Sequence, residues 1–331
     1  MTEDAGNGGR VVIGGSTGFI GRRLQEEYRR EGREVVTISR SGADLRWDDQ
    51  DGIDAAVDGA AVVVGLAGKS VNCRYTPENR AEILRSRLAT TAALSGAVAR
   101  ADAPPPLWVN SSTATIYRHA EDRPQTESAG ELGSGFSVEV AKAWERALFA
   151  DPLPRTRRVA LRTAIVLGDG GVMGPLRTLA RVGLGGTQLD GRWPVSRRRR
   201  EAGTAHVFGA RGGRQRFSWI HLDDVVGIVG FLERTPGLDG PVNAAAPHPS
   251  DNAGFMAAIR RALGVRIGVP MPRWMLEIGA IGIRTETELI LKSRWVLPER
   301  LTAAGYVFRH PDLDEAVRDA LGVPALQEAV R

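Results

Sequence analysis

The sequence predicts an α/β protein: a doubly wound parallel sheet of the Rossmann type with a smaller mixed α/β lobe in its C-terminal part. Short apolar runs alternate with amphipathic helical patterns through the first half of the chain. A glycine-rich turn joins the first run to the first helix, and the regular alternation fades after about residue 167. Because strand–helix–strand crossovers are right-handed, this order indicates a parallel sheet. We expect a Rossmann core over 10–167 and a lobe over 168–323, some of whose segments return to the core.

Each element follows from its local pattern. Apolar, β-branched runs predict buried parallel strands, and they cover 10–13, 34–39, 60–66, 107–110 and 159–166. Apolar residues at helical spacing predict helices, and these cover 19–31, 76–100, 137–150 and, in the lobe, 270–282. Gly32 is placed to end the first helix, and Thr76-Pro77 to open the second.

Composition narrows the class of protein. The 331 residues are 42% hydrophobic and 25% charged, which is ordinary for a globular chain. No apolar run approaches the roughly 20 residues of a membrane span. The stretch Met1–Arg10 lacks the basic-then-apolar order of a secretory signal. Cys73 is the only cysteine, so no intrachain disulfide is possible, and we expect a cytoplasmic protein that does not bind membranes.

The glycine-rich turn predicts a dinucleotide site. Gly15, Gly18 and Gly21 form G-x-x-G-x-x-G between a strand and a helix. The first glycine permits the tight turn, the second lets backbone approach a pyrophosphate, and the third lets the helix pack on the strand. The helix N-terminus then offers free N–H groups to the phosphates. The expected binding residues are Gly15, Thr17, Gly18, Phe19, Ile20 and Gly21.

The end of the second strand favours NADP over NAD as the cofactor. An acidic residue there would bind the ribose 2′-hydroxyl of NAD, but this chain has Ser39-Arg40-Ser41. A guanidinium flanked by hydroxyls suits a 2′-phosphate, so we assign Ser39 and Arg40 to it. The third strand ends in the small residues Leu66, Ala67 and Gly68, which let backbone lie against the cofactor.

A basic segment stands out in the lobe. The net charge is +5, and residues 189–216, named here the Arg-rich segment, carry eight arginines against Asp190 and Glu201. A solvated surface loop explains such a run most simply. A lid that binds phosphate or carboxylate is the second interpretation. Nucleic-acid binding is not expected, because no aromatic residue interrupts Arg197–Arg200.

Several stretches together resemble the short-chain dehydrogenase/reductase superfamily, in its extended, epimerase-like branch. The resemblance covers nearly the whole chain and is strongest to atypical epimerase-family proteins with a C-terminal domain of unknown function, here near 270–320. The stretches are Gly14–Gly21, Leu66-Ala67-Gly68, Ser86-Arg87, Gly183–Gly186, Ser218-Trp219-Ile220-His221, Leu291-Lys292-Ser293 and Pro298–Leu301. The resemblance implies an oxidoreductase or isomerase fold family that binds a nicotinamide cofactor.

The resemblance also implies a catalytic set, and this chain departs from it. The stretch Asn110–Tyr117, named here the strand-end motif, is similar to the epimerase pattern in which the catalytic hydroxyl directly precedes Ala-Thr-x-Tyr, and this implies that Thr113 carries that hydroxyl. Lys142 matches the family lysine, which binds the cofactor ribose. The tyrosine position, four residues before that lysine, holds Val138. Valine cannot exchange a proton, so the usual general acid or base is missing. Tyr117, Glu139, the substrate or water remain as alternatives.

Further residues follow by resemblance. Glu82 and Arg87 are implied to line the cofactor site, although an ion pair within the fold would also explain them, and Ser111 and Val166 are implied to meet the cofactor at strand ends. About 20 residues, Arg197–Arg200 among them, are inserted relative to the family pattern. We expect no metal at His221-Leu222-Asp223-Asp224; instead Asp223 or Asp224 should cap a helix.

Two functions remain open. The first is an NADP-dependent oxidoreductase or epimerase-like enzyme that acts on a small polar metabolite as a monomer or homodimer. The second is a catalytically silent NADP-binding regulatory or scaffold protein. Position 138 separates them, because it decides whether the usual proton partner exists.

Overall fold

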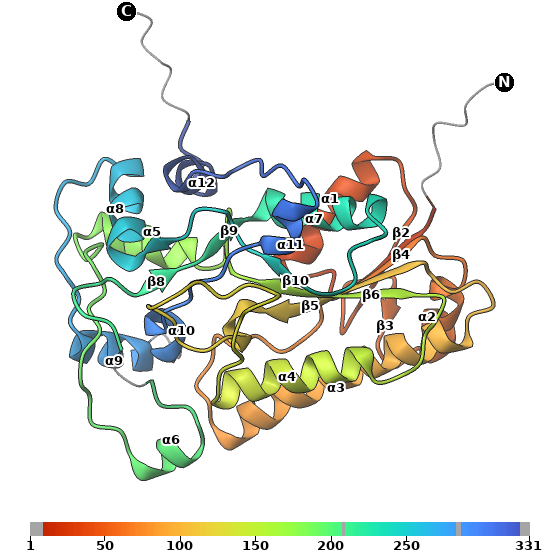
Figure 1. Cartoon of the computed structure of the whole chain (residues 1–331), viewed down its shortest axis with the longest axis horizontal. Helices are drawn as coiled ribbons and strands as arrows, with labels where there is room; N and C mark the ends of the chain where they lie inside the picture. Colours follow the sequence, from red (N-terminus) through yellow and green to blue (C-terminus); the bar gives the residue numbers. More distant parts are fainter. Residues whose placement is uncertain (1–8, 207–208, 283–285, 325–331) are drawn as a thin grey trace, which may run out of the picture.

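The computed structural model describes residues 9–206, 209–282 and 286–324; most of the stretch Met1–Arg10 lies outside them. Its centre is a seven-stranded sheet in which all strands are parallel (Figure 1). In spatial order the strands are β10 (Gly240–Ala244), β6 (Arg157–Thr163), β5 (Leu107–Thr113), β4 (Val62–Gly65), β1 (Val11–Gly14), β2 (Val35–Ser39) and β3 (Leu45–Arg46). The order reverses direction between β1 and β4, the place where such sheets bind ligands.

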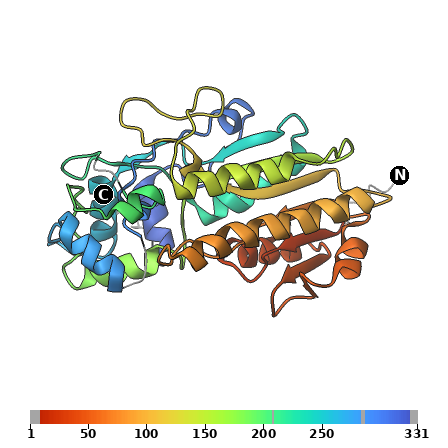
Figure 2. The same ribbon diagram turned by 90° about the horizontal axis from the view of Figure 1, so that it is seen from below.

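Helices cover both faces of this sheet. One face carries α1 (Phe19–Arg30) and α7 (Leu222–Arg234). The other carries α2 (Gln50–Val57), α3 (Pro77–Arg100) and α4 (Phe136–Phe149), and Figure 2 shows α3 and α4 side by side. Residues of β1 alternate between the two layers: Val11 and Ile13 pack toward α1, and Val12 toward α2 and α3. The predicted doubly wound fold is therefore confirmed.

The lobe lies beyond the carboxyl ends of the strands (Figure 1). It contains two small sheets, β7 (Ile165–Leu167) with β9 (Trp219–His221) and β8 (Arg216–Phe217) with β11 (Ser250–Asp251). A second core forms where Phe217 stacks on Phe255 at 4.0 Å between ring centroids. The helices of this part are α5 (Met173–Arg181), α6 (Arg197–Glu201), α8 (Asn252–Ala262), α9 (Arg273–Gly282), α10 (Glu288–Leu291) and α12 (Leu313–Ala320). Helix α11 (Glu299–Ala303) instead packs on β10 of the main sheet.

Local signals fixed several helix ends as expected. Thr76 caps α3 by accepting a hydrogen bond from the Asn79 backbone, and Pro77 occupies its first turn. Helix α1 stops at Arg30, two residues before Gly32, which takes the left-handed conformation with φ of +76°. Among the described helices, none is both long enough and apolar enough to cross a membrane.

The last predicted strand, 159–166, was wrong as a single element. It divides into β6 and β7 at Ala164. Up to Thr163 the chain pairs with β5 and β10, whereas Ile165 pairs with Trp219 of β9 outside the main sheet. Both halves are apolar, so periodicity alone could not place the break, which depends on a partner strand more than 50 residues away in sequence.

Candidate functional site

The glycine-rich turn has little room for side chains. Gly15 has a φ of +84°, and a Cβ on it would lie 2.7 Å from the backbone nitrogen of Ala67. A Cβ on Gly21 would lie 2.5 Å from the carbonyl oxygen of Gly15. The backbone after β4 therefore runs directly against the turn after β1, and only glycine fits at these two positions.

The start of α1 is open to an anion. Thr17 and Gly18 are exposed, and no side chain caps the helix at Gly18. The first N–H groups of a helix need a partner from outside it, and a pyrophosphate supplies negative charge at the positive end of the helix dipole. Phe19 and Ile20 are partly buried in the first turn. The residues present thus fit the phosphates of a dinucleotide.

Residues from distant segments close around this turn. The ring of Phe19 packs against the loop after β7, where a Cβ on Gly168 would lie 2.9 Å from it. Arg87 packs under Gly68, and its guanidinium donates to the carbonyl oxygens of Lys69 and Ile83, each at 2.9 Å. Burial lowers the pKa of Arg87 to about 10. Its charge lies beneath the loop that follows β4, with the Trp144 ring 4.9 Å away.

The end of β2 carries an exposed cation. Arg40 is exposed, and the Ser39 hydroxyl is turned back to the backbone of Ser41. Asp44 accepts hydrogen bonds from the backbone and hydroxyl of Thr37, which hold its pKa below the usual value. Asp48 is paired with Arg46 at 3.0 Å. The carboxylates of Asp44 and Asp48 are therefore bonded to Thr37 and Arg46 and do not lie free at the end of β2.

The strand-end motif is held by its own hydrogen bonds. Thr113 ends β5 and its hydroxyl accepts from the Thr115 backbone at 3.1 Å. The Tyr117 hydroxyl donates to Asn243 at 2.9 Å and accepts from Arg162 at 2.8 Å, deep in the core. Burial raises the pKa of Tyr117. Its phenol is locked between two protein groups, which argues against proton exchange with a substrate.

The helix that should carry tyrosine and lysine is α4. Val138 is wholly buried, with 0% exposure. Lys142 donates to the carbonyl oxygen of Gly133 at 2.9 Å and to Glu139 at 3.0 Å. Glu139 is exposed and bound to that lysine. Thr113 and Lys142 are thus each bonded to other protein groups.

The other residues implied by the resemblance lie at varied depths. Glu82 is part-exposed and accepts from Arg85, its neighbour one turn along α3, at 2.9 Å. Ser111 is partly buried near the end of β5, and its carbonyl oxygen accepts from the Asn110 side chain. Val166 is partly buried in β7.

Three buried ionisable residues of the lobe approach the strand-end motif. Lys292 donates to the carbonyl oxygen of Thr115 at 2.8 Å, and Arg294 donates to the Thr115 hydroxyl at 3.2 Å. Glu288 is buried, and one of its carboxylate oxygens has no hydrogen-bond partner. Burial and the charge of Arg294 lower the pKa of Lys292 to about 8. Sequence reasoning missed this group, because only the tertiary fold brings residues 288–294 to residue 115.

The expected cap at Asp223 or Asp224 was wrong. Helix α7 begins at Leu222, so both acids lie inside its first turn, and the ring Nδ1 of His221 accepts from the Asp223 backbone at 3.2 Å. Asp224 is instead buried and accepts from the backbones of Arg309 and His310 at 2.7 and 3.0 Å. It thereby ties the C-terminal segment to α7.

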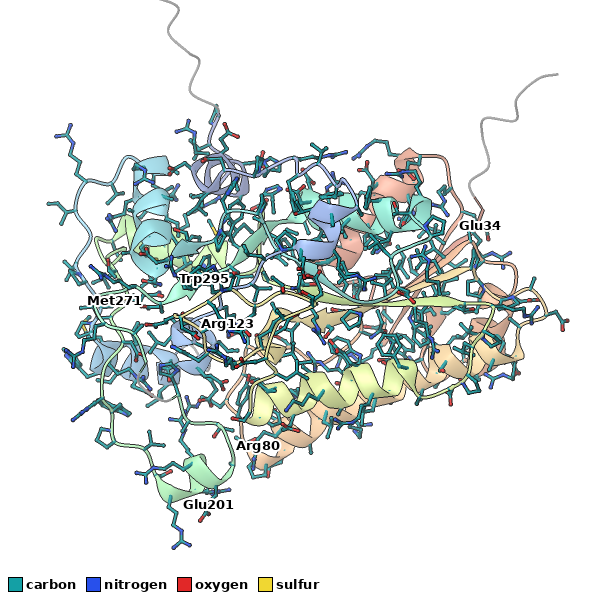
Figure 3. All side chains as sticks on the ribbon, in the orientation of Figure 1. Glu34, Arg80, Arg123, Glu201, Met271 and Trp295 are labelled. Carbon is teal, nitrogen blue, oxygen red and sulfur yellow. The ribbon has the colours of Figure 1, made fainter. Side chains whose placement is uncertain are left out.

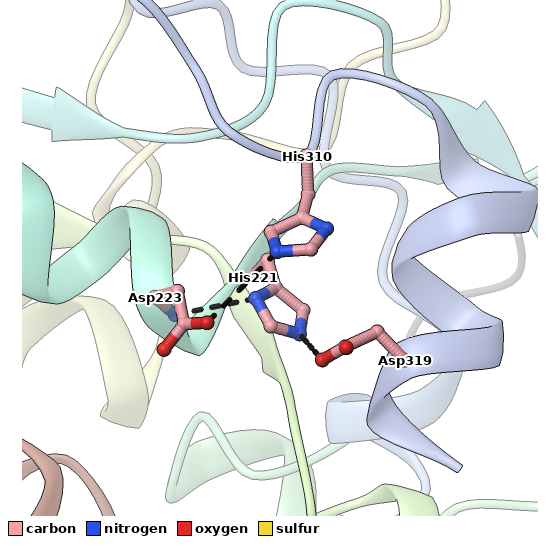
Figure 4. A group of neighbouring side chains, drawn as sticks. All are labelled: His221, Asp223, His310 and Asp319. Atoms are coloured by element: carbon pink, nitrogen blue, oxygen red, sulfur yellow. Dashed lines mark hydrogen bonds and ion pairs between the residues drawn. The ribbon is translucent and has the colours of Figure 1, made fainter. Parts of the chain in front are cut away.

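His221 also joins a group with Asp223, His310 and Asp319 (Figure 4). Its Nε2 lies 3.0 Å from an oxygen of Asp319, and its ring lies 3.9 Å from that of His310. Asp223 is paired with Arg23 at 2.9 Å. Burial, and then the neighbouring His310, lower the pKa of His221. These contacts dock α12 against the start of α7, and we assign them that role.

The Arg-rich segment is anchored to the lobe. Asp190 is buried and receives His206 at 2.9 Å and Arg273 at 3.0 Å. Although burial opposes its ionisation, the hydrogen bonds from His206 and the Gly209 backbone lower the pKa of Asp190 to about 2. Further along, the backbone of Phe136 at the start of α4 donates to Gly203 at 2.9 Å. The segment is therefore docked beside α4.

Comparison with known proteins decides the family. The NAD dependent epimerase/dehydratase family matches residues 11–139, and a domain of unknown function, DUF1731, matches residues 271–320. The bovine epimerase family protein SDR39U1 is 32% identical over 319 residues, which cover 94% of this chain and 99% of that protein. The chain belongs to this epimerase family. A Bacillus subtilis member, YfhF, is 26% identical and covers 93% of this chain and 96% of its own.

Solved structures agree with the fold of the family. Human SDR39U1 (isoform 2), crystallised with NADPH, is 30% identical, with a TM-score of 0.80 over 95% of this chain and 99% of that one. A UDP-glucose 4-epimerase from Thermotoga maritima is 14% identical, with a TM-score of 0.70 over 95% and 97% of the two chains. The second likeness concerns the fold alone. The epimerase-family fold expected from the sequence is confirmed.

Proposed function

We propose that this epimerase-family protein binds NADP(H) and acts as an oxidoreductase or epimerase-like enzyme on a small polar metabolite, with a proton partner other than the usual tyrosine. The observation that carries the cofactor assignment is the end of β2. Arg40 is exposed there, while Asp44 and Asp48 are bonded to Thr37 and Arg46. A free guanidinium without a competing carboxylate favours a 2′-phosphate over a 2′-hydroxyl. The NADPH in the human relative supports the same choice.

The chain's own residues would position the dinucleotide. The open first turn of α1 would hold its pyrophosphate, and the backbone of residues 66–68 would lie along it. The nicotinamide supplies a hydride acceptor or donor when bound. Phe19, packed on the glycines after β7, would cover the far end of the turn and exclude water.

The proton partner would come from a residue other than Val138. Tyr117 is committed to Asn243 and Arg162. Lys292 reaches the strand-end motif from the lobe, and a lysine with a pKa of about 8 can give up a proton near neutral pH. Lys292 is also buried and bonded, to the Thr115 carbonyl oxygen, but its pKa is lowered whereas that of Tyr117 is raised, so we favour Lys292 over Tyr117 for this role.

A catalytically silent cofactor-binding protein is the second candidate. The burial of Val138 and the attachment of Lys142 to Gly133 and Glu139 favour it, because valine has no ionisable proton and the lysine ammonium is held by two protein acceptors. Nicotinamide absorbance followed against a panel of small polar carbonyl and hydroxyl compounds separates the two. Turnover that Lys292→Met abolishes without loss of NADPH binding supports the enzyme. Tight NADPH binding without turnover across the panel supports the silent protein.

The cofactor assignment is tested by Arg40→Ala. Fluorescence titration should show NADPH affinity lowered at least about tenfold, which corresponds to about 1.4 kcal/mol for one lost phosphate contact. Affinity for NADH should change less than about twofold. Arg46→Ala is the matched control, because this arginine lies on neighbouring β3 and is exposed but paired with Asp48. Equal losses for NADPH and NADH would show that Arg40 does not read the 2′-phosphate.

A further inference from the structure

A pocket of about 240 Å³ lies between the start of α3 and the inserted helix α6. Figure 3 labels Arg80, which lies on α3 and lines the pocket, and Glu201 at the end of α6. Four arginines line it against a single carboxylate, that of Glu286. The arginines are Arg74, Arg80, Arg198 and Arg199. The lining therefore carries an excess of positive charge.

The one carboxylate of the lining, that of Glu286, is already bonded to other protein groups. Glu286 accepts from Arg199 at 2.7 Å and from the backbone of Tyr75 at 2.9 Å, and Arg74 lies 3.5 Å from it. These bonds fix α6 against the loop before α3. They leave no negative group of the lining for the remaining arginines.

Two guanidinium groups of the lining, those of Arg80 and Arg198, have no ion pair within the described part of the chain. The Nε of Arg80 is buried and has no hydrogen-bond partner, and its guanidinium lies 6.0 Å from the centroid of the Phe136 ring. Arg198 is exposed on α6, and its side chain makes no ion pair within the described part of the chain. Glu78 lies outside the lining. Hydrogen bonds from its own backbone and from Thr76 lower the pKa of Glu78, and the nearby charges of Arg198 and Arg80 lower it further. A buried donor without a partner costs free energy, so the pocket favours an anion.

The pocket adjoins the site proposed for the reaction. Tyr75 lines it, and the Tyr75 hydroxyl lies 3.4 Å from that of Ser137, the residue before Val138. The loop that supplies Arg74 and Tyr75 follows the carboxyl end of β4, the edge of the sheet at which ligands of this fold class bind. A group held in the pocket would thus extend from a substrate near α4.

We propose that this pocket binds a phosphate group of the substrate, so that the enzyme acts on a phosphorylated small metabolite. The inference rests on the proposed function for its link to a substrate. Guanidinium groups pair with phosphate oxygens in a bidentate manner, and Arg80 and Arg198 approach from two different elements. At about 240 Å³ the pocket is smaller than the roughly 300–1,000 Å³ of sites for drug-sized ligands. It therefore suits a single phosphate group rather than a dinucleotide.

Isothermal titration of the full chain with inorganic phosphate, at constant ionic strength and with and without saturating NADPH, tests the proposal. Phosphate should bind, and succinate, a dicarboxylate, should bind at least tenfold more weakly. Arg198→Ala and the Arg80→Ala/Arg198→Ala pair should each lower phosphate affinity, the pair by at least tenfold, while NADPH affinity stays within twofold. Arg80→Lys should retain part of the phosphate affinity, because lysine keeps the positive charge but lacks the paired N–H donors of the guanidinium.

Arg197→Ala is the matched control. It removes the same charge from the same helix, but Arg197 is 92% exposed, paired with Glu201 and outside the lining. If Arg197→Ala lost as much phosphate affinity as Arg198→Ala, general electrostatic attraction would explain the binding and the proposal would be wrong. Undetectable binding of phosphate to the wild-type chain would also overturn the proposal. If the wild-type chain binds phosphate but does not bind NADPH, the proposed function fails and the pocket assignment stands. Thermal melting of each variant verifies that it is folded.

Discussion

At the scale of single residues, the glycine-rich turn depends on the absence of a Cβ atom in glycine. Gly15 combines a positive φ with the close approach of the backbone at Ala67. Either feature alone would disfavour a side chain, and at position 15 both would act on the same Cβ atom. The residue type was readable from the glycine pattern, but its partner, a backbone after β4, was not.

Gly15→Ala should therefore destabilise the fold more than an ordinary left-handed glycine would. We expect a loss of about 1 kcal/mol from the backbone conformation and a further 1–3 kcal/mol, roughly, from the clash with Ala67. NADPH binding should fall with it. Urea unfolding followed by circular dichroism measures the free energy, and fluorescence titration measures the binding.

Gly42→Ala is the control for that substitution. Gly42 also has a positive φ, +68°, but a Cβ there would meet nothing within 4 Å. It should lose only the conformational part, about 1 kcal/mol. If the two variants lost equal stability, the close packing of β1 and β4 at the turn would not be the reason for glycine at position 15.

At the scale of elements, the start of α7 joins the core to the C-terminal segment. His221 caps the helix with one ring nitrogen and meets Asp319 of α12 with the other. Asp224, in the first turn of α7, accepts hydrogen bonds from the backbones of Arg309 and His310. The sequence pattern His-x-Asp-Asp by itself favours an aspartate cap, but in the fold the Asp224 carboxylate accepts hydrogen bonds from the Tyr306 hydroxyl and from the backbones of Arg309 and His310.

This junction predicts a dependence of stability on pH. The folded pKa of His221 is lowered below its unfolded value of about 6.5. Between those two values the unfolded chain binds more protons, so stability should fall as pH drops below about 6.5, by up to about 1.4 kcal/mol per pH unit for this group. Unfolding in urea at a series of pH values from 8 to 5 measures the slope.

His221→Asn should flatten that slope. The asparagine side chain can still accept the cap hydrogen bond but does not titrate in this range. His248→Asn is the matched control, because His248 is exposed and should leave the slope unchanged. A slope that survives in His221→Asn would assign the acid sensitivity to groups other than His221.

At the scale of the whole molecule, the sheet is completed by chain that lies beyond the predicted Rossmann segment. Strand β10 pairs with β6 along five residues, Gly240–Ala244, and α7 packs on the face that α1 covers. Residues of α7 and β10 belong to the same core cluster as Val11 and Ile13. The lobe and the core are therefore interleaved in sequence.

A fragment of residues 1–168 should consequently fail to fold on its own. Without α7 and β10, part of one face of the sheet would be exposed, and large exposed apolar surfaces are not tolerated in stable monomers. We expect a fragment without cooperative thermal unfolding, measured by circular dichroism, while the full chain unfolds cooperatively. A sharp transition in the fragment would contradict this and would make residues 10–167 a self-sufficient domain.

The sequence by itself determined the order of the longer strands and helices through residue 150, the glycine-rich turn, the capped start of α3 and the absence of tyrosine at position 138. These features depend on residue type and short spacing, which the chain carries locally. Short elements such as β3 and α2 escaped it, because their patterns span too few residues.

Only the tertiary structure decided which distant residues share one place. It split β6 from β7, returned β10 to the sheet, brought Lys292 to Thr115 and set Arg80 beside Arg198. Each of these depends on long-range pairing and on burial, and burial also sets the charge state of groups such as Lys292. The fold class was therefore readable from the chain, whereas the substrate side of the site was not.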